Sequence, residues 1–176
     1  MKQNQFKRFL IPFILLVLFI YVYIGNIGKM TEVINTDGQK NVGEITSGTE
    51  VSQSFISPMN NLSGFSIKLA TYARVNEGRV TLGIRELGDS RTIYSTTIKA
   101  ESLPDNAYYD VRFPPIKFSK DKKYLIFVSS TDSSAGHAIT AYMSSKDTYS
   151  DGDYMKNGEQ QQGDLAFKVV CNHTLF

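Results

Sequence analysis

The sequence predicts an all-β protein, an antiparallel two-sheet β-sandwich or jelly roll, preceded by one N-terminal transmembrane helix. From residue 51 onward, apolar and polar residues alternate with a period of two, which is typical of half-buried strands. Turn-forming residues separate the alternating runs at a spacing of about 10–20 residues. Outside the N-terminal segment there is no helical stripe, so the crossover helices that a parallel sheet needs are missing.

The N-terminal segment, residues 9–25 (FLIPFILLVLFIYVYIG), contains no charged side chain. A helix of about 17 residues is about 25 Å long, which is near the lower limit for crossing a bilayer. Lys2, Lys7 and Arg8 precede this segment. Because basic residues flanking a span stay inside, residues 1–8 are expected in the cytoplasm and the C-terminal domain outside it.

A retained signal-anchor is favoured over the alternative, a cleaved signal peptide. Tyr21 and Tyr23 occupy the positions of an interfacial aromatic belt, and the small residues of a cleavage site do not follow. No cysteine directly follows the apolar run either, so a lipoprotein anchor is excluded. The expected topology is that of a single-pass membrane protein.

Residues 26–48 carry few apolar side chains and predict a connector or stalk, with an irregular first strand from Thr31 to Ile34 as the alternative. The extracytoplasmic sandwich is expected over residues 49–176. Leu165, Phe167 and Val169 are expected to form the inward face of a late strand. The strands are predicted where apolar residues alternate or β-branched residues gather, at residues 51–55, 65–69, 80–84, 93–98, 109–113, 124–128, 139–143 and 165–169.

Composition excludes several partners and sites. The formal net charge is +2, and removing the three basic residues before the apolar run from the 19 leaves 16 against 17 acidic ones. Because basic and acidic residues nearly balance, the domain offers no basic surface for a phosphate backbone, and no nucleic-acid partner is expected. The single cysteine, Cys171, excludes an internal disulfide and a cysteine-ligated zinc site.

Motifs for catalysis are missing from the sequence. There is neither a Gly-x-Ser-x-Gly nucleophile elbow nor a phosphate-binding glycine loop, and His137 and His173 are the only imidazoles. An enzymatic function would require His137 to lie within hydrogen-bond reach of a carboxylate and a hydroxyl group in a pocket. The sequence therefore predicts no enzyme, no catalytic residue and no cofactor.

An acidic segment near the C-terminus is a candidate metal site. Asp147, Asp151 and Asp153 lie close together, but Met155 and Lys156 occupy the positions where an EF-hand loop needs a ligand and a glycine. A solvated loop with a turn at Asp151-Gly152 explains the segment more simply. No metal site is predicted, although a structural Ca²⁺ held by carboxylates and main-chain carbonyls stays open.

Exposed aromatic rings can stack on the apolar faces of sugars. Most phenylalanines fall on core positions, whereas several tyrosines fall at strand ends or in loops, and Arg74 follows one of them closely. These residues are the candidate ligand-binding set, with core packing at the sandwich edge as the alternative for each tyrosine: Tyr72, Arg74, Tyr142, Tyr149 and Tyr154.

Several short segments occur in an order that resembles a known group of domains. They are VSQSF (51–55), NLSGF (61–65), LATY (69–72), DVRFPPI (110–116), KYLI (123–126), YSDG (149–152) and GDLAF (163–167). Together they resemble bacterial extracytoplasmic jelly-roll domains of the carbohydrate-binding-module type, which occur appended to membrane glycosyltransferases and cell-surface proteins. The resemblance implies a jelly roll with a sugar-binding, non-catalytic role.

Two functions from different classes follow. The first is a membrane-anchored, extracytoplasmic β-sandwich that binds or positions a cell-envelope glycan without catalysis, which requires Tyr72, Arg74, Tyr142 and Tyr154 to converge on one exposed patch. The second is a protein–protein interaction or assembly module, an accessory subunit beside an envelope glycosyltransferase, another polysaccharide-synthesis enzyme or a secretion protein. It requires an exposed apolar patch or a bare edge strand.

Overall fold

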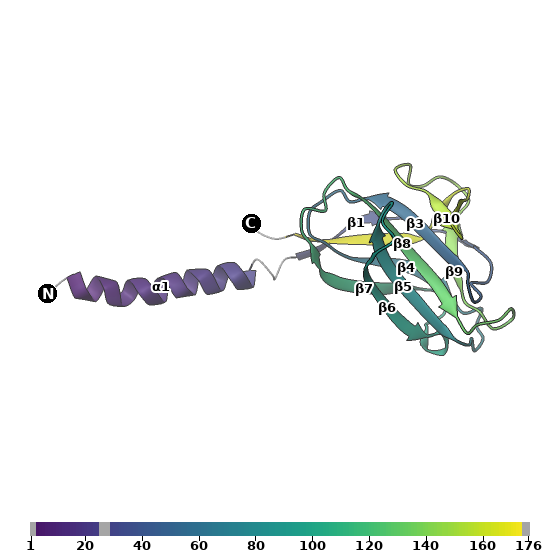
Figure 1. The fold of residues 1–176 in the computed structure, drawn as a ribbon, viewed down its shortest axis with the longest axis horizontal. Coiled ribbons are helices and arrows are strands. Elements are labelled where there is room, and N and C mark those ends of the chain that lie inside the picture. Colours follow the sequence, from purple (N-terminus) through teal and green to yellow (C-terminus); the bar gives the residue numbers. More distant parts are fainter. Residues whose placement is uncertain (1–2, 25–28, 174–176) are drawn as a thin grey trace.

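The computed structural model describes residues 3–24 and 29–173. A helix, α1 (Gln3–Ile24), precedes a β-sandwich (Figure 1). It covers the expected span up to Ile24 and begins earlier, at Gln3. Among the described residues, no helix is both long enough and apolar enough to cross a bilayer. The expected roles of Lys2, Lys7, Arg8, Tyr21 and Tyr23 fall on side chains outside the described part of the chain.

Two antiparallel sheets form the sandwich, as the sequence predicts. In the seven-stranded sheet, the order is β1 (Lys29–Asn35), β13 (Phe167–His173), β4 (Leu62–Ala70), β9 (Thr140–Ser144) and β12 (Asp164–Leu165), while β2 (Lys40–Asn41) pairs with β9 and β7 (Ala107–Ile116) pairs with β4. In the six-stranded sheet, the order is β11 (Glu159–Gln160), β10 (Tyr154–Lys156), β3 (Glu50–Ile56), β8 (Lys123–Thr131), β5 (Arg79–Glu86) and β6 (Thr92–Lys99).

The core lies between the two sheets and is built from the predicted alternation. Leu165, Phe167 and Val169 are fully buried, which confirms the inward face of the last strands. The central strand β8 is buried on both faces, because Leu125 and Phe127 are covered as well. The Arg85 guanidinium lies 5.0 Å from the centre of the Phe127 ring and covers it from outside.

The segment expected as a connector is part of the sandwich. Its alternative, a first strand near Thr31 to Ile34, is observed as β1, which pairs with β13 and places Ile34 in the core. Ile45 is also fully buried. The sandwich therefore begins near Lys29 and not at residue 49, because main-chain pairing compensates for the low apolar content that made this segment look like a stalk.

The strand expected at residues 165–169 is divided between two partners. β12 pairs with β9, while β13 pairs with β4 and β1. Two further strands, β10 and β11, form a hairpin whose turn is Asn157-Gly158, with φ of 51° and 81°. A positive φ at both central residues is what a type I′ hairpin turn requires, and Asn-Gly is the sequence that supplies it most readily.

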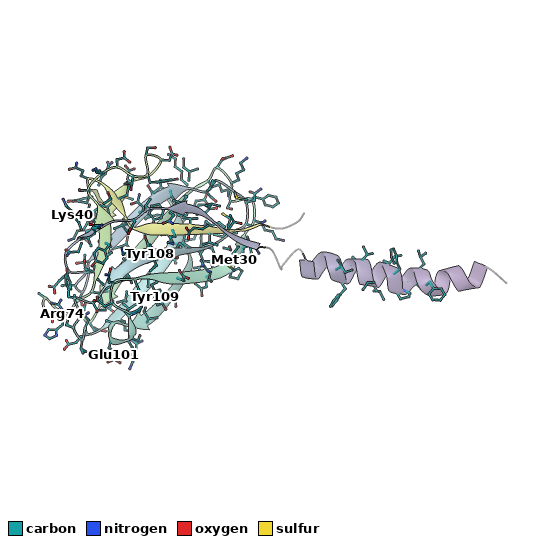
Figure 2. All side chains as sticks on the ribbon, turned by 180° about the vertical axis from the view of Figure 1, so that it is seen from behind. Met30, Lys40, Arg74, Glu101, Tyr108 and Tyr109 are labelled. Carbon is teal, nitrogen blue, oxygen red and sulfur yellow. The ribbon has the colours of Figure 1, made fainter. Side chains whose placement is uncertain are left out.

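The loops gather at two ends of the sandwich. The proximal end, near α1, carries the β3–β4, β5–β6 and β7–β8 connections, and the distal end carries the β2–β3, β4–β5 and β8–β9 loops and η1 (Ala100–Ser102) between β6 and β7. Figure 2 places Met30 at the proximal end and both Arg74 and Glu101 at the distal end. The surface of the sandwich thus consists of two ends, two outer faces and the open edges of the sheets.

Candidate functional site

Two of the predicted site residues, Tyr72 and Arg74, meet in the β4–β5 loop at the distal end. The Arg74 guanidinium lies 4.8 Å from the centre of the Tyr72 ring. It donates to Asn76 Oδ1 at 3.1 Å and to the Ala138 carbonyl at 3.0 Å, and it forms an ion pair with Glu44. The hydrogen bond from the Gly136 N–H and the charge of Arg74 hold the pKa of Glu44 below its usual value.

The loop holds Tyr72 in an unusual conformation. Tyr72 and Ala73 have φ of 59° and 54°, a region that bulky residues seldom adopt. The Asp105 carboxylate accepts a hydrogen bond of 2.6 Å from the Thr71 N–H, and Asn76 Nδ2 donates to the Thr71 carbonyl at 2.9 Å. Because polar contacts fix the loop on both sides, the Tyr72 ring stays at the surface, 38% exposed.

A cavity of about 340 Å³ lies beside this loop and is mostly charged at its rim. His137 also belongs to the distal end, with its Nδ1 3.7 Å from Glu77 Oε1 and both side chains more than half exposed. Within the described part of the chain, no hydrogen bond joins this imidazole to a hydroxyl group, so the geometry required for an enzymatic site is not found there. The cavity is lined by Val75, Asn76, Glu77, Gly78, Arg79, Lys99, Glu101 and Asp132.

Tyr142 lies elsewhere, on the outer face of the seven-stranded sheet. The Lys68 ammonium is 5.1 Å from the centre of its ring and 5.9 Å from that of Tyr108. Lys168 lies 4.8 Å from the Tyr108 ring centre on the same face. Lys68 is paired with Asp37 at 2.9 Å and Lys168 with Glu32 at 3.0 Å, so both ammonium groups are neutralised by neighbours.

Tyr108, labelled in Figure 2, was not among the predicted site residues. Its hydroxyl donates to the Thr36 carbonyl at 2.8 Å. Burial, with the negative charge of Asp37 adding to it, raises the pKa of Tyr108 to about 12. Lysines cover the Tyr108 and Tyr142 rings and their charges are paired, so these two rings belong to a closed polar network and do not form a vacant aromatic platform.

Tyr149 and Tyr154 lie inside the sandwich edge. The Tyr149 hydroxyl accepts from the Ile56 N–H at 3.1 Å and lies 3.3 Å from the Ile56 carbonyl, and its ring meets Phe167 edge-on at 5.6 Å and 87°. Tyr154 is only 3% exposed and belongs to the core. Burial raises the pKa of both phenols. The expected convergence of Tyr72, Arg74, Tyr142 and Tyr154 on one exposed patch is therefore not found.

The acidic segment at residues 151–153 packs against β3 and bonds to the β10–β11 hairpin. Gly152 packs so closely on β3 that a Cβ there would come within 1.9 Å of the Ser54 carbonyl oxygen. Asp153 Oδ1 accepts a hydrogen bond of 2.6 Å from Gln160 Nε2. Among the described residues, no group of three histidine, cysteine or acidic side chains is placed to hold a metal ion. A second cavity, of about 290 Å³, is lined by Ser54, Phe55, Ile56, Leu87, Lys123, Ser150, Asp151, Gly152 and Asp153.

The outer edge of β6 leaves main-chain groups open to further pairing. This strand ends the six-stranded sheet, and within residues 3–24 and 29–173 it pairs only with β5. The Ala100 N–H donates to the Gly78 carbonyl at 3.0 Å, which fixes the phase of the ladder. Because hydrogen-bonded pairs alternate along antiparallel strands, Ser95 and Thr97 direct their N–H and C=O groups away from β5, into the open edge.

The sequence contained the signal for this edge, since residues 93–98 (IYSTTI) are β-branched or aromatic apart from one serine. The pattern could not tell whether the strand was central or terminal, because that depends on sheet order. No protein-family model matches the chain, and no curated protein matches its sequence.

Proposed function

We propose that the protein is a membrane-anchored, extracytoplasmic assembly module whose β6 edge accepts an extended segment of a partner protein. The open row of main-chain groups at Ser95 and Thr97 carries this proposal. An edge strand of this kind is a template onto which a further strand can pair, with main-chain hydrogen bonds supplying the affinity. The protein would act as a non-catalytic accessory subunit beside an envelope glycosyltransferase or a secretion protein.

The other long edge strands, β1 and β7, are protected against pairing with a further strand, whereas β6 is not. β1 carries Glu32 and an irregularity in its register between Glu32 and Ile34. β7 carries two charged residues and the prolines Pro114 and Pro115. Charges, prolines and bulges are the usual devices that stop edge strands from pairing. By contrast, residues 92–98 of β6 contain no charge and no proline, which supports a role for this edge in pairing.

A partner protein is favoured over a second copy of the chain. β6 runs from the proximal end, at Thr92, toward the distal end, at Lys99. If two copies paired their β6 strands antiparallel, their proximal ends would lie on opposite sides and their α1 helices would leave in opposite directions. Two such chains would not fit into one bilayer, so the proposed occupant is an extended segment of another protein.

Membrane anchorage is part of the same proposal. Within α1, every residue from 9 to 20 is exposed, and all except Pro12 are large and apolar. A helix that is apolar on all sides needs an apolar environment. Lys2, Lys7 and Arg8 precede this run, so the positive-inside rule would place the sandwich outside the cytoplasm. The finer assignment to a jelly roll is proposed with it.

The test compares two substitutions at one position of β6. Ser95→Pro removes an N–H that points into the open edge, while the ladder to β5 stays intact, and Ser95→Ala keeps that N–H. A photo-crosslinking residue at position 97 of the full-length, membrane-embedded chain should form an adduct with a partner protein. We expect the adduct to be lost in Ser95→Pro and retained in Ser95→Ala.

Equal unfolding midpoints of the two variants in urea would confirm that folding is not the cause of the loss. An adduct that persists in Ser95→Pro would contradict the proposal, and so would an adduct that consists of two copies of this chain.

Glycan binding is the second candidate, and it has one observation in its favour. Tyr72, Arg74 and the neighbouring cavity share the distal end, where an exposed ring lies beside hydrogen-bond donors. The proposal is that this end, and not the expected four-residue patch, contacts a cell-envelope glycan. Binding to arrayed envelope glycans should then fall at least about tenfold in Tyr72→Ala and stay unchanged in Tyr142→Ala. Uniform binding to all glycans by both variants would count against it.

A further inference from the structure

The β7–β8 loop, taken here with the first residue of β8 as residues 117–123 (KFSKDKK), presents an exposed aromatic ring among lysines. It carries four lysines and one aspartate. Phe118 is 79% exposed, more than any other large apolar residue of the described sandwich. Lys117, Lys120 and Lys123 are exposed, and none of the three has an ion-pair partner within the described residues. The loop therefore combines an apolar side chain with uncompensated positive charge.

The loop is held in a fixed conformation. Ser119 is fully buried, where its hydroxyl donates to the Met59 carbonyl at 3.0 Å and accepts from the Leu62 N–H at 3.1 Å. The Asp121 N–H donates to the Ser57 carbonyl at 2.8 Å. Phe118 itself has φ of 55°, which is rare for a bulky residue. Such a network keeps the Phe118 ring in water when burial would be more favourable, which points to an apolar partner.

This loop lies at the end of the sandwich from which α1 departs. The β7–β8 loop packs on Leu62, the first residue of β4, and the neighbouring Asn61 carbonyl accepts from the Asn172 N–H at 2.8 Å. Asn172 in turn pairs with Met30 at the beginning of β1. Only residues 25–28 separate α1 from β1, and the five residue steps from Ile24 to Lys29 span at most about 18 Å. The proximal end must therefore stay close to the end of α1.

A neighbouring loop contributes to the same surface. The Leu87 N–H of the β5–β6 loop donates to the Lys123 carbonyl at 2.9 Å, and its side chain is exposed. Two acidic groups at the neighbouring loop are already engaged, since Glu86 lies 3.9 Å from Lys122 and Asp89 pairs with Arg91 at 2.8 Å, so that Asp121 is the one acidic residue set against the lysines within residues 117–123. The other three lysines of this loop outnumber Asp121, so a net positive charge is available to an external anion.

We propose that the β7–β8 loop binds the anionic headgroup surface of the bilayer that holds α1, with Phe118 inserted at the interface. Lysines near an anionic leaflet are attracted to it, and an apolar ring among them enters the boundary between headgroups and acyl chains. This contact would fix the sandwich upright on the membrane and hold the β6 edge at a constant height. The inference rests on the proposed membrane anchorage.

The chain has no tryptophan, so a single introduced indole reports its own environment. The matched variants are F118W at the proximal end and V75W at the distal end, because Val75 is 76% exposed and Phe118 is 79% exposed. The full chain would be reconstituted into nanodiscs of phosphatidylcholine alone or with phosphatidylglycerol, and quenching by brominated acyl chains measured. We expect at least about twofold quenching and a blue-shifted emission for F118W in the anionic discs and neither for V75W.

Removing the lysine charge should reverse the effect. In F118W carrying K117Q, K120Q and K123Q, we expect the emission in anionic discs to return to that of V75W. Equal spectra of F118W and V75W in the anionic discs would overturn the inference, and quenching of F118W that is independent of phosphatidylglycerol would overturn the role of the lysines. Resistance of the same samples to alkaline carbonate extraction reports α1 separately. An anchored chain without quenching refutes this inference alone, whereas an extracted chain refutes the anchorage on which it rests.

Discussion

Gln53 and Asp164 face each other across the interior of the sandwich, with Gln53 Nε2 donating to Asp164 Oδ1 at 3.1 Å. Gln53 belongs to the six-stranded sheet and Asp164 to the seven-stranded one, and both side chains are buried. Gln53 Oε1 accepts from the Leu165 N–H at 2.9 Å. Asp164 Oδ2 accepts from the N–H groups of Thr148 and Tyr149 at 2.6 and 3.0 Å. One buried polar pair thus joins the sheets and holds the loop between β9 and β10.

Asp164→Ala should lower the free energy of unfolding by about 3 kcal/mol, because it leaves several buried donors without an acceptor. Urea unfolding of the full chain in detergent, followed by circular dichroism, measures this change. The matched control is Asp151→Ala, an exposed aspartate on the same loop, which should stay within about 0.5 kcal/mol of the wild type. Equal effects of the two substitutions would show that the buried pair does not organise the loop.

Gly152→Ala should cost about 3 kcal/mol of stability, because the added methyl group meets main-chain atoms of β3 that cannot move aside. Gly88→Ala serves as the comparison. Gly88 has φ of +89° and no atom within 4 Å of an added Cβ, so only the conformational cost of about 1 kcal/mol applies. Unfolding midpoints in urea distinguish the two. If Gly88→Ala were the more damaging variant, the close approach of the 151–153 segment to β3 would be refuted.

Acid should weaken the distal loop through Asp105. The hydrogen bond from the Thr71 N–H lowers the pKa of Asp105 from its ordinary 3.8. Because the folded pKa is the lower one, the stabilisation is present above the ordinary value and is lost as the pH falls through the folded pKa. Asp105→Asn should therefore flatten the decline of stability with falling pH below about pH 4. An unchanged slope in urea titrations at a series of pH values would contradict this role.

Cys171 should be unreactive while the protein is folded. Its side chain is fully buried, and burial raises the pKa of the thiol above 9.0, so little thiolate forms near neutral pH. A thiol reagent such as dithiobisnitrobenzoate should label it completely in urea and hardly at all in native buffer. Labelling in native buffer at the rate of a free thiol would show that β13 opens readily.

Much of the fold could be predicted from the sequence, because the core-facing residues obey a strict period. Phe65, Ile67 and Leu69 in β4 lie where the alternation places them, and all three are buried. For residues 29–48 the structure has the first strand that was the alternative to a connector, since β1 is held by main-chain pairing with β13 and not by its apolar content. The β10–β11 hairpin was missed as well, although its Asn157-Gly158 turn was visible.

The candidate site was less accessible to sequence reasoning. Tyr72 and Arg74 are two residues apart, so their contact could be predicted from their proximity in the chain. Tyr154 is the first residue of the short strand β10 and pairs with Gln53, and nothing in the local sequence indicates that this edge is covered. The open edge of β6 depends on the order of strands in the sheet, which is a long-range property. Short sequence patterns describe which side chains face inward, but not which strand ends a sheet.

The pairing of β1 with β13 also has a mechanical consequence. The chain enters the sandwich at Lys29, opposite His173, and runs lengthwise along β13. A pull on α1 therefore acts along β1 and loads the hydrogen bonds of this ladder in shear, so that they must break together. A strand peeled from its end would release them one by one at a lower force. The junction between helix and sandwich is thus built to bear tension.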